Sequence, residues 1–415
     1  MENRVSGCCP EKDTGLWITN LNFWLTSGCN FRCRYCYENK IKDLPIKTAD
    51  KEIIKQLLNW FFDDRISGKN NNLSLNFFGG EPLLYPDLIE FTCIEGKKLE
   101  AKTGKRISFS MTTNASLLTK EMVEFFKIFN MGYLISLDGD LDTMLRWRGI
   151  QDSEKNLEIL KRTEDNARLI YQLYPNLTTR ITLPNSELKR IFHNTLYIYS
   201  LGCNNISAHI VTDGAGEIQS DGVEDYKQQM EEMYYWLKSF LIRGQKIPYS
   251  TVDKCLNHRG NPLEQGACGA GKGFLGISPD GGIYPCHRFV IWDEWRLGDV
   301  FHYELDNDKR KIFINFKRKN LERCLNCESK TCHSQCYASN YAKFKNIFSI
   351  HPLYCEIKKI EEKIADRLKN DPDIIKRQIK TQKNKINDLQ NKNLEINQRF
   401  EELKRSLING KANKE

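Results

Sequence analysis

Strand-like and helix-like segments alternate six times along the first half of this chain, and this alternation limits the folds open to it. The strand-like segments are 17–25, 73–78, 107–112, 133–137, 178–183 and 206–211. Between them, apolar residues recur three or four positions apart, which is the period of a helix with one buried face. Repeated β–α units imply parallel strands joined by right-handed crossovers. We therefore predict an α/β fold whose first part is a partial (β/α)6 barrel, an open version of the TIM barrel.

Residues suited to binding and chemistry lie directly after the predicted strands. Three cysteines follow the first strand, a Gly-Gly-Glu-Pro turn follows the second, and polar residues follow the third and fourth. These residues are Cys29, Cys33 and Cys36; Gly79, Gly80, Glu81 and Pro82; Asn114; and Ser136 and Asp138. The carboxyl ends of parallel strands lie on one face of a barrel, where its ligand sites are built. The sequence therefore predicts one site made from all four segments.

The residue types at these strand ends suit a ligand that has an ammonium group. Glycine has no Cβ, so Gly79 and Gly80 allow backbone carbonyls to approach a ligand closely. Together with the Glu81 carboxylate, those carbonyls would hold the ammonium group beside a turn that Pro82 fixes. The polar side chains after the third and fourth strands would bond a carboxylate or a ribose. Capping of the strand ends is an equally good interpretation of them.

The cysteine spacing C-x3-C-x2-C brings three thiolates together within eight residues. Protein [4Fe–4S] cubanes are usually held by four cysteines, so a local triad leaves one iron open, as in a catalytic metal centre. Structural zinc is the alternative, although it normally uses paired C-x2-C spacings. With Tyr37 after the third cysteine and the Gly-Gly-Glu-Pro turn, the chain resembles the radical SAM superfamily. The resemblance implies that the open iron binds S-adenosylmethionine (SAM) and that segment 79–82 binds its amine.

A second group of cysteines lies in the later part of the chain. Its members are Cys255, Cys268, Cys286, Cys324, Cys327, Cys332, Cys336 and Cys355. Segment 276–284 predicts a β-hairpin around an Asp-Gly turn, which would deliver Cys286 to a fixed position. The run from 324 to 336 is dense enough for its thiolates to share metals. The ligand type alone allows zinc or Fe–S.

This second pattern is similar to that of a SPASM domain, the C-terminal module of radical SAM enzymes that modify peptides and proteins. The spacing departs from that family by one residue between Cys327 and Cys332. The resemblance implies two auxiliary [4Fe–4S] clusters, whose ligand sets are Cys324, Cys327, Cys332 and Cys355, and Cys268, Cys286 and Cys336 with Cys255 as fourth ligand. Without Cys255, the second cluster would keep an open iron for a substrate thiolate.

The residue after Cys286 bears on the reaction. In anaerobic sulfatase-maturating enzymes an aspartate there is the proposed base, whereas this chain has His287. The segment looks like that of maturases that form thioether links, in which His287 near neutrality would accept the thiol proton. A hydrogen bond toward the auxiliary cluster is the other interpretation of this histidine.

The resemblance implies that a 5′-deoxyadenosyl radical modifies a ribosomally made precursor peptide, and a thioether crosslink is the expected product. The alternatives are carbon–carbon crosslinking, epimerisation and sulfatase-type oxidation of cysteine or serine. A non-catalytic Fe–S or zinc scaffold is the alternative from another class, but it would not need the Gly-Gly-Glu-Pro segment. A low-potential electron donor, flavodoxin or ferredoxin, is the expected redox partner.

The C-terminal segment 373–408 contains neither cysteine nor glycine and follows a heptad pattern. The seam positions are Ile375, Ile379, Gln382, Ile386, Leu389, Asn393, Ile396, Phe400, Leu403 and Leu407. Isolated polar residues in such a seam commonly specify register or partner. We expect a helical extension that forms a homodimer or binds a separate leader-binding partner. Packing on the chain's own barrel is the alternative.

Length and charge complete the expectations. A chain of 415 residues exceeds one ordinary core. We expect an N-terminal segment 1–15, a barrel 16–245, a SPASM domain 246–356 and a helical extension 357–415. The sequence shows neither a run of about 20 apolar residues nor a signal-peptide core, which predicts a cytoplasmic protein without a membrane partner. The net charge of +8 is scattered, so no nucleic-acid partner is expected.

Overall fold

A single sheet organises the computed structural model, which describes residues 17–41, 43–149, 153–174, 177–266, 268–332 and 335–412. Within these residues the strand order is β6-β5-β4-β3-β2-β1-β7-β8-β9. The six parallel strands are β1 (Asn20–Thr26), β2 (Asn72–Gly79), β3 (Arg106–Thr113), β4 (Gly132–Ser136), β5 (Thr178–Leu183) and β6 (Ile206–Ile210). Each predicted strand is therefore confirmed, in parallel pairing and in chain order.

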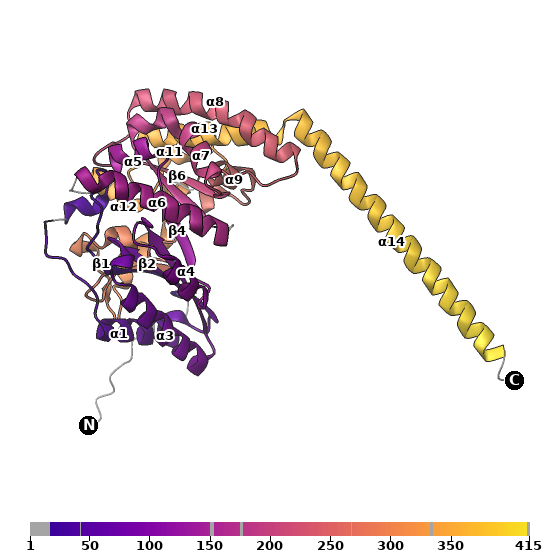
Figure 1. Ribbon diagram of the computed structural model, residues 1–415, viewed down its shortest axis with the longest axis horizontal. Helices are drawn as coiled ribbons and strands as arrows, with labels where there is room; N and C mark the ends of the chain where they lie inside the picture. The colour runs from indigo at the N-terminus through magenta and orange to yellow at the C-terminus, as the bar shows by residue number, and fades with distance from the viewer. Residues whose placement is uncertain are drawn as a thin grey trace.

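Helices connect the parallel strands and cover the outside of the sheet (Figure 1). They are α1 (Lys51–Phe62), α2 (Asp64–Ser67), α3 (Pro86–Thr103), α4 (Lys120–Lys127), α5 (Leu141–Trp147), α6 (Ser153–Leu173), α7 (Ile191–Ser200) and α8 (Ser220–Ile242). The first of them begins where the Asp50 side chain accepts the Ile53 amide hydrogen at 2.8 Å, which caps an otherwise unpaired donor. Its buried face is apolar, as the helical period predicts, and includes Ile54, Leu58 and Phe61.

The predicted hairpin is present, and it also extends the barrel sheet. Strand β7 (Phe274–Ile277) pairs with β1 in parallel and with β8 (Gly282–Tyr284) in antiparallel register. A short third strand, β9 (Gly298–Asp299), pairs with β8. The sheet therefore runs without a break across the position where we expected one domain to end and the next to begin.

The remaining cysteine-rich segment has an apolar core of its own. Its helices are α9 (Ser250–Leu256), α10 (Asn307–Asn315), α11 (Glu322–Leu325) and α12 (Tyr337–Phe344). Its core consists of Ala270, Tyr284, Cys286, Phe289, Phe313, Phe316, Tyr337, Ala338 and Ile347. This segment therefore packs around a core separate from that of the barrel, but its hairpin belongs to the barrel sheet.

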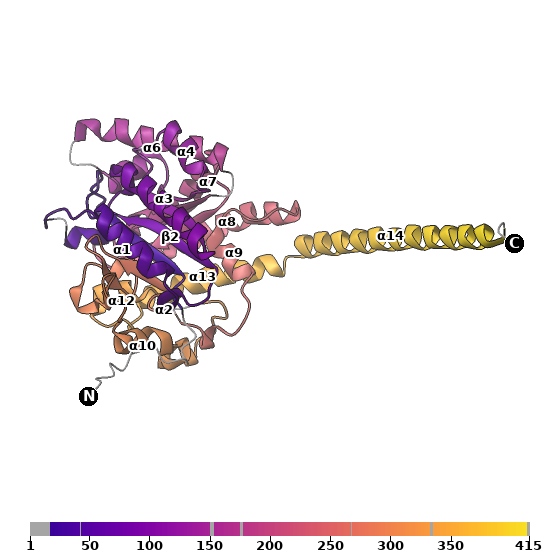
Figure 2. The same ribbon diagram turned by 90° about the horizontal axis from the view of Figure 1, so that it is seen from below.

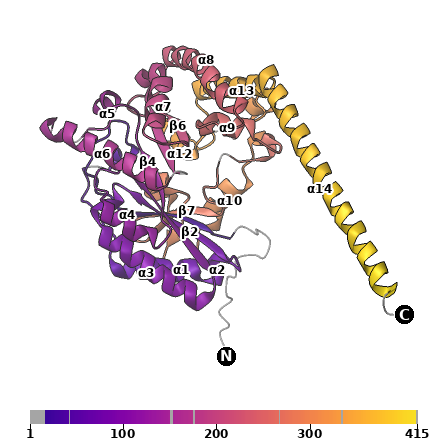
Figure 3. The same ribbon diagram turned by 45° about the vertical axis from the view of Figure 1, so that its right-hand side comes forward.

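The two C-terminal helices differ in their contact with the body of the protein. Helix α13 (Pro352–Lys369) packs on α8 and α9, where its buried Glu361 accepts hydrogen bonds from the Tyr226 hydroxyl at 3.0 Å and the Lys358 ammonium at 2.6 Å. Helix α14 (Pro372–Ala412) projects away from the body (Figures 2 and 3). No helix in the described part of the chain is long and apolar enough to cross a membrane.

The junction between β1 and β2 leaves no room for side chains. Gly79 has a φ of +107°, and a Cβ there would lie 2.3 Å from the Thr26 carbonyl oxygen. A Cβ on Gly80 would lie 1.9 Å from the Gly28 oxygen and 3.0 Å from the Cys29 nitrogen. The amide of Glu81 also donates to the Gly28 oxygen at 2.9 Å. The two glycines therefore allow the turn after β2 to pack directly on the loop that begins with Cys29.

We predict that Gly80→Ala lowers the stability of the metal-free protein by about 1–3 kcal/mol, because backbone rather than a flexible side chain occupies the space of the new methyl group. Thermal unfolding measures this change. Gly269→Ala is the control, since a Cβ there meets its nearest atom at an ordinary 3.4 Å. Equal melting temperatures for the two variants would show that the junction tolerates a side chain.

Candidate functional site

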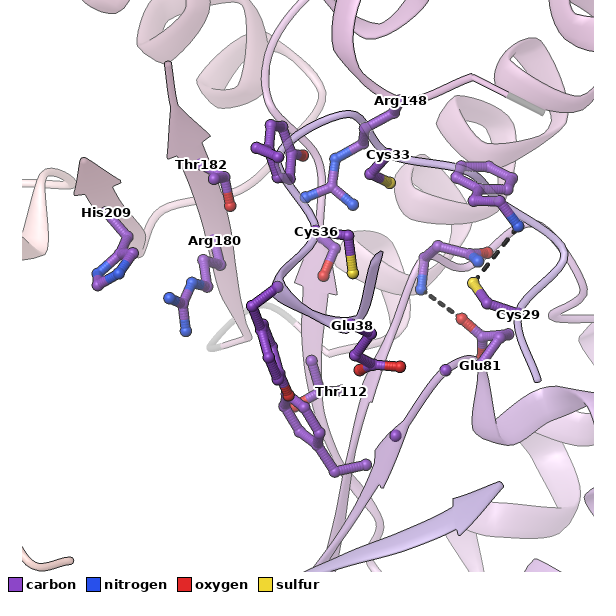
Figure 4. Close-up of a pocket in the computed structure, with 18 of the residues that line it drawn as sticks. Cys29, Cys33, Cys36, Glu38, Glu81, Thr112, Arg148, Arg180, Thr182 and His209 are labelled. Carbon is purple, nitrogen blue, oxygen red and sulfur yellow. Dashed lines mark hydrogen bonds between the residues drawn. The ribbon is translucent and has the colours of Figure 1, made fainter. Parts of the chain in front are cut away.

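One pocket opens at the carboxyl ends of the parallel strands, with an empty volume of about 1040 Å³. A concave site at the carboxyl ends of parallel strands is where such folds bind small molecules. The predicted site residues that line it are Cys29, Cys33, Cys36, Gly79, Gly80, Glu81, Asn114, Ser136 and His287. Pro82 and Asp138 do not line it. Strand ends far apart in sequence therefore meet as predicted (Figure 4).

Three free thiols from the loop after β1 face this pocket and are half-buried. The loop is held by its own backbone and by Asn39, whose amide donates to the Cys33 carbonyl at 3.0 Å. Burial raises the pKa of the Cys33 thiol to about 11 and also raises the pKa of Cys29 and Cys36. Because metals bind thiolates, loading this site must release protons.

The donor chemistry of the triad fits an iron–sulfur cluster better than a single ion. Among the described residues, no three His, Cys, Asp or Glu side chains are close enough together to hold one metal ion. In a cubane each cysteine binds a different iron, so the sulfurs need not converge on one point. The three sulfur ligands therefore match a [4Fe–4S] cluster with one iron left open.

Glu81 lines the pocket, but its carboxylate is hydrogen-bonded to groups of the protein itself. Its carboxylate accepts hydrogen bonds from the Asn114 amide at 2.7 Å, the Thr113 hydroxyl at 2.7 Å and the Leu83 amide at 3.0 Å. Burial raises its pKa to about 7, and the backbone donors oppose that rise. Glu81 therefore ties the end of β2 to the end of β3, and its charge is not reserved for a ligand ammonium group. Pro82 begins the turn behind it.

Asp138 acts on the pocket through an arginine. Its carboxylate accepts two hydrogen bonds from the Arg148 guanidinium, at 2.7 and 3.1 Å, and a third from the Thr182 amide at 2.8 Å. Tyr35 also donates to it. Arg148 lines the pocket, whereas Asp138 lies behind it. Asp138 is therefore a positioning residue for Arg148, and the expectation that it contacts the cofactor is not supported.

The side chains of Asn114 and Ser136 differ in whether they hydrogen-bond to other residues of the protein. The Asn114 amide donates to Asn30 at 2.9 Å and accepts from the Ser116 amide at 2.9 Å, so it connects β3 to the cysteine loop. The Ser136 hydroxyl makes no hydrogen bond within the described residues and faces the pocket. Strand-end bonding therefore accounts for the asparagine, and the serine stays available to a ligand.

His287 faces the pocket, but its expected pKa near neutrality is wrong. Burial lowers the pKa to about 3, and the positive charges of Arg180 and Arg288 lower it further. Its Nδ1 accepts a hydrogen bond from the Asn22 amide at 2.6 Å. The neutral ring consequently carries its proton on Nε2. A ring with so acidic a conjugate acid is a poor acceptor for a thiol proton at neutral pH.

A chain of amides holds His287 in this orientation. The Asn22 oxygen accepts from Asn76 at 3.0 Å, and the Asn76 oxygen accepts from the Ser110 hydroxyl at 3.0 Å. These residues belong to β1, β2 and β3, so three barrel strands orient a residue of the cysteine-rich segment. The Phe78 ring packs against the imidazole with centroids 4.2 Å apart.

Several pocket residues were not predicted from the sequence. They are Tyr37, Glu38, Arg180, Thr182, His209, Asp213 and Arg288. Arg288 binds Asp213 at 3.4 Å and contacts Cys336 Sγ at 3.7 Å, which joins the cysteine-rich segment to the end of β6. Arg180 has neither a hydrogen bond nor an ion pair from its side chain within the described residues, although it lies in a partly desolvated site. The alternation of β5 identifies Arg180 and Thr182 as sharing one face.

The later cysteines fall into two groups. Burial raises the pKa of the Cys286 thiol, and the neighbouring thiols of Cys336 and Cys268 raise it further. Burial also raises the pKa of Cys355, and its neighbours are Cys332, Cys324 and Cys327. The charges that act on each thiol therefore include those of the partners that the family resemblance implies, together with Arg288 for Cys286 and Arg323 for Cys355.

Cys255 lies beside helix α13. It lies on α9, where burial raises the pKa of its thiol to about 11 and a hydrogen bond with Thr331 lowers it. The largest charge effects on it come from Glu361, Lys358 and Glu362 of α13. These neighbours differ from those of Cys286 and Cys355, and the expected role of Cys255 as a fourth cluster ligand stays a prediction.

Comparison with known proteins agrees with this site. Residues 25–178 match the family model of the radical SAM superfamily. The radical SAM cyclopropyl synthase TigE of Paramaledivibacter caminithermalis is 23% identical over 86% of this chain and 76% of its own length. The cysteine-type anaerobic sulfatase-maturating enzyme of Clostridium novyi is 24% identical over 77% of this chain and 88% of its own.

Two solved structures share the fold. Native anSMEcpe with bound AdoMet superimposes with a TM-score of 0.70 at 19% identity, over 85% of this chain and 98% of that one. Streptococcus suis SuiB bound to the precursor peptide SuiA gives a TM-score of 0.58 at 17% identity, over 82% and 77%. These two likenesses show a shared fold, and the match of the family model carries the assignment of the domain. The chain carries a radical SAM domain, which spans residues 25–178 and contains the cysteine triad.

Proposed function

We propose that this protein is a radical SAM maturase that modifies a ribosomally made precursor peptide. The observation that carries the proposal is that three half-buried free thiols share one pocket with the Gly-Gly-Glu turn and with residues of the cysteine-rich segment. When bound, the cluster and SAM supply the chemistry, in which one electron cleaves SAM to methionine and a 5′-deoxyadenosyl radical that abstracts a substrate hydrogen atom. A low-potential flavodoxin or ferredoxin is the proposed electron donor.

The chain's own residues would bind and orient the reactants. Cys29, Cys33 and Cys36 supply the three cluster thiolates. The pocket offers the Ser136 hydroxyl and the Arg148 guanidinium to polar groups of SAM, and Asp138 keeps that guanidinium in place. A non-catalytic metal scaffold would need none of these pocket groups. The pocket therefore favours an enzyme.

We further propose two auxiliary clusters in the cysteine-rich segment. The grouping of Cys324, Cys327, Cys332 and Cys355 supports one cluster with four ligands. The grouping of Cys268, Cys286 and Cys336 supports a second cluster with three, because Cys255 lies against α13. Its open iron would accept a substrate thiolate. Arg288 lines the pocket and contacts Cys336, so it connects the pocket to this second cluster site.

A peptide substrate is proposed from the relatives. SuiB is described with its precursor peptide SuiA, and anSMEcpe with the peptide Cp18Cys. A thioether link is our preferred product, since an open auxiliary iron suits a cysteine thiolate. Forming it replaces an S–H and a C–H bond by one S–C bond: the 5′-deoxyadenosyl radical would take one hydrogen atom, solvent would take one proton, and a bound auxiliary cluster would accept the remaining electron. Carbon–carbon bond formation is the second candidate, because TigE is a cyclopropyl synthase.

Reductive cleavage of SAM tests the reaction class. Anaerobically reconstituted protein with dithionite and SAM should form 5′-deoxyadenosine, measured by liquid chromatography. Cys33→Ala should reduce this product to the no-enzyme background, because it removes a cluster ligand. Cys93→Ala, which changes a buried cysteine of the α3 core, should retain it. Absence of 5′-deoxyadenosine from fully loaded wild-type protein would refute the proposed function.

The type of product is a separate prediction. A precursor peptide encoded beside this gene and co-expressed with the enzyme should lose two hydrogens for each crosslink, as measured by mass spectrometry. Thiol alkylation should then leave one cysteine unlabelled for each link. Loss of two hydrogens with every cysteine alkylatable would favour a carbon–carbon bond. An unchanged mass would favour epimerisation.

Iron content tests the three-cysteine auxiliary cluster. Cys255→Ser should leave the iron and sulfide content of the reconstituted protein unchanged, because the thiol is hydrogen-bonded to Thr331 beside the charges of α13. Cys286→Ser should lower it by about four iron atoms per chain. Loss of the same amount of iron from Cys255→Ser would instead make Cys255 a ligand.

A further inference from the structure

The long helix α14 exposes an apolar seam. Its first turn is anchored to the body, where Ile374 is buried and Asp371 and Asp373 each bind Lys238, at 2.9 and 2.8 Å. Beyond that turn, the apolar seam residues whose side chains the structure describes, Ile379, Ile386, Leu389 and Ile396, are solvent-exposed, by 47% for Ile379 and 64% for Ile396. The views in Figures 1 and 2 show the helix leaving the body without a covering element.

An exposed seam of this kind implies a binding partner. In a heptad written a to g, the first and fourth positions, a and d, form the seam. Here Ile379 and Ile386 are a residues, and Ile375, Leu389 and Ile396 are d residues. Long helices derive most of their stability from packing of an apolar face, so an uncovered seam disfavours the isolated helix. The alternative interpretation, that this segment packs on its own barrel, does not hold from Ile379 to Ile396, where the described apolar seam residues are exposed.

The positions that flank the seam carry one sign of charge. Between 376 and 399, the flanking e and g positions hold five basic residues and three amides, and none is acidic. The basic residues are Lys376, Lys383, Lys385, Lys392 and Arg399. All five are exposed, and none makes an ion pair in the part of the chain that the structure describes. The acidic residues of this stretch, Asp388 and Glu395, occupy c positions farther from the seam.

This charge pattern disfavours a second copy of the chain as the partner. In a parallel pair, g positions face e positions, so Lys385 meets Gln390 and Gln378 meets Lys383. In an antiparallel pair, like positions face one another and lysine meets lysine. Neither arrangement forms an attractive ion pair between the described residues, and both align five cations from each helix along one seam. A helix with acidic flanks would instead pair with every one of them.

We propose that α14 docks an amphipathic helix of a separate chain, with an apolar seam and aspartate or glutamate at its flanking positions. The apolar contacts supply affinity, and the charges select the partner and its register. The proposal does not depend on the reaction assigned above, because α14 contributes no residue to the pocket.

Two synthetic peptides of about four heptads serve as probes. Both carry the same Ile and Leu seam, and they differ only in glutamate or lysine at every flanking position. Fluorescence anisotropy with the full-length protein should show binding of the acidic peptide at least roughly ten-fold tighter than that of the basic peptide. Added salt should weaken binding of the acidic peptide, because the flanking charges are exposed.

Charge reversal provides the decisive variant. Lys383→Glu, Lys385→Glu and Lys392→Glu together should exchange the preference, so that the basic peptide binds more tightly. The matched control introduces three glutamates on the outer f positions, as Asn384→Glu, Asn391→Glu and Gln398→Glu, and should keep the wild-type preference. Circular dichroism of both variants should show unchanged helix content, because all six positions are exposed.

Three results would overturn the proposal. The first is equal binding of the two peptides. The second is an unchanged preference after reversal of the flanking charges. The third is light scattering that shows twice the 48.5 kDa chain mass at micromolar concentration, with dissociation caused by Leu389→Asp. That last result would assign the seam to a second copy of the chain.

Discussion

The backbone contact between Gly80 and the start of the cysteine loop is the constraint on which the site depends. A Cβ at Gly80 would lie 1.9 Å from the Gly28 oxygen, so only glycine lets the end of β2 approach the end of β1 this closely. Glu81 then binds the Asn114 amide and brings in β3. The cysteine triad is consequently held against the rest of the pocket by main-chain contacts, which are more rigid than side-chain contacts.

Charge pairing explains much of the remaining pocket. Two buried or nearly buried arginines each have a carboxylate partner: Arg148 pairs with Asp138, and Arg288 pairs with Asp213. Such pairs hold a guanidinium in one orientation, and removing either partner leaves a costly buried charge. Arg180 has no such partner in the described residues, and burial and the nearby Arg288 lower its pKa. An anionic group of a bound ligand would therefore be stabilised beside it.

Sequence reasoning succeeded where local pattern and physical position coincide. Parallel strands place their carboxyl ends on one face, so a cysteine triad, a Gly-Gly-Glu turn and Ser136 could be assigned to one site before any fold was known. It failed for His287, whose pKa depends on the Arg180 and Arg288 charges and on burial. It also misplaced Asp138, which follows a strand as a ligand residue would but turns behind Arg148.

The sequence by itself determined the six β–α units, the ligand chemistry of the triad and the heptad seam of α14, because each is encoded in local spacing. Tertiary structure decided which distant groups meet. It brought β7 beside β1, so that His287 hydrogen-bonds to Asn22, and it placed Cys255 beside Glu361 and Lys358 of α13. Contacts between residues hundreds of positions apart depend on how whole elements pack, and residue spacing carries no record of that packing.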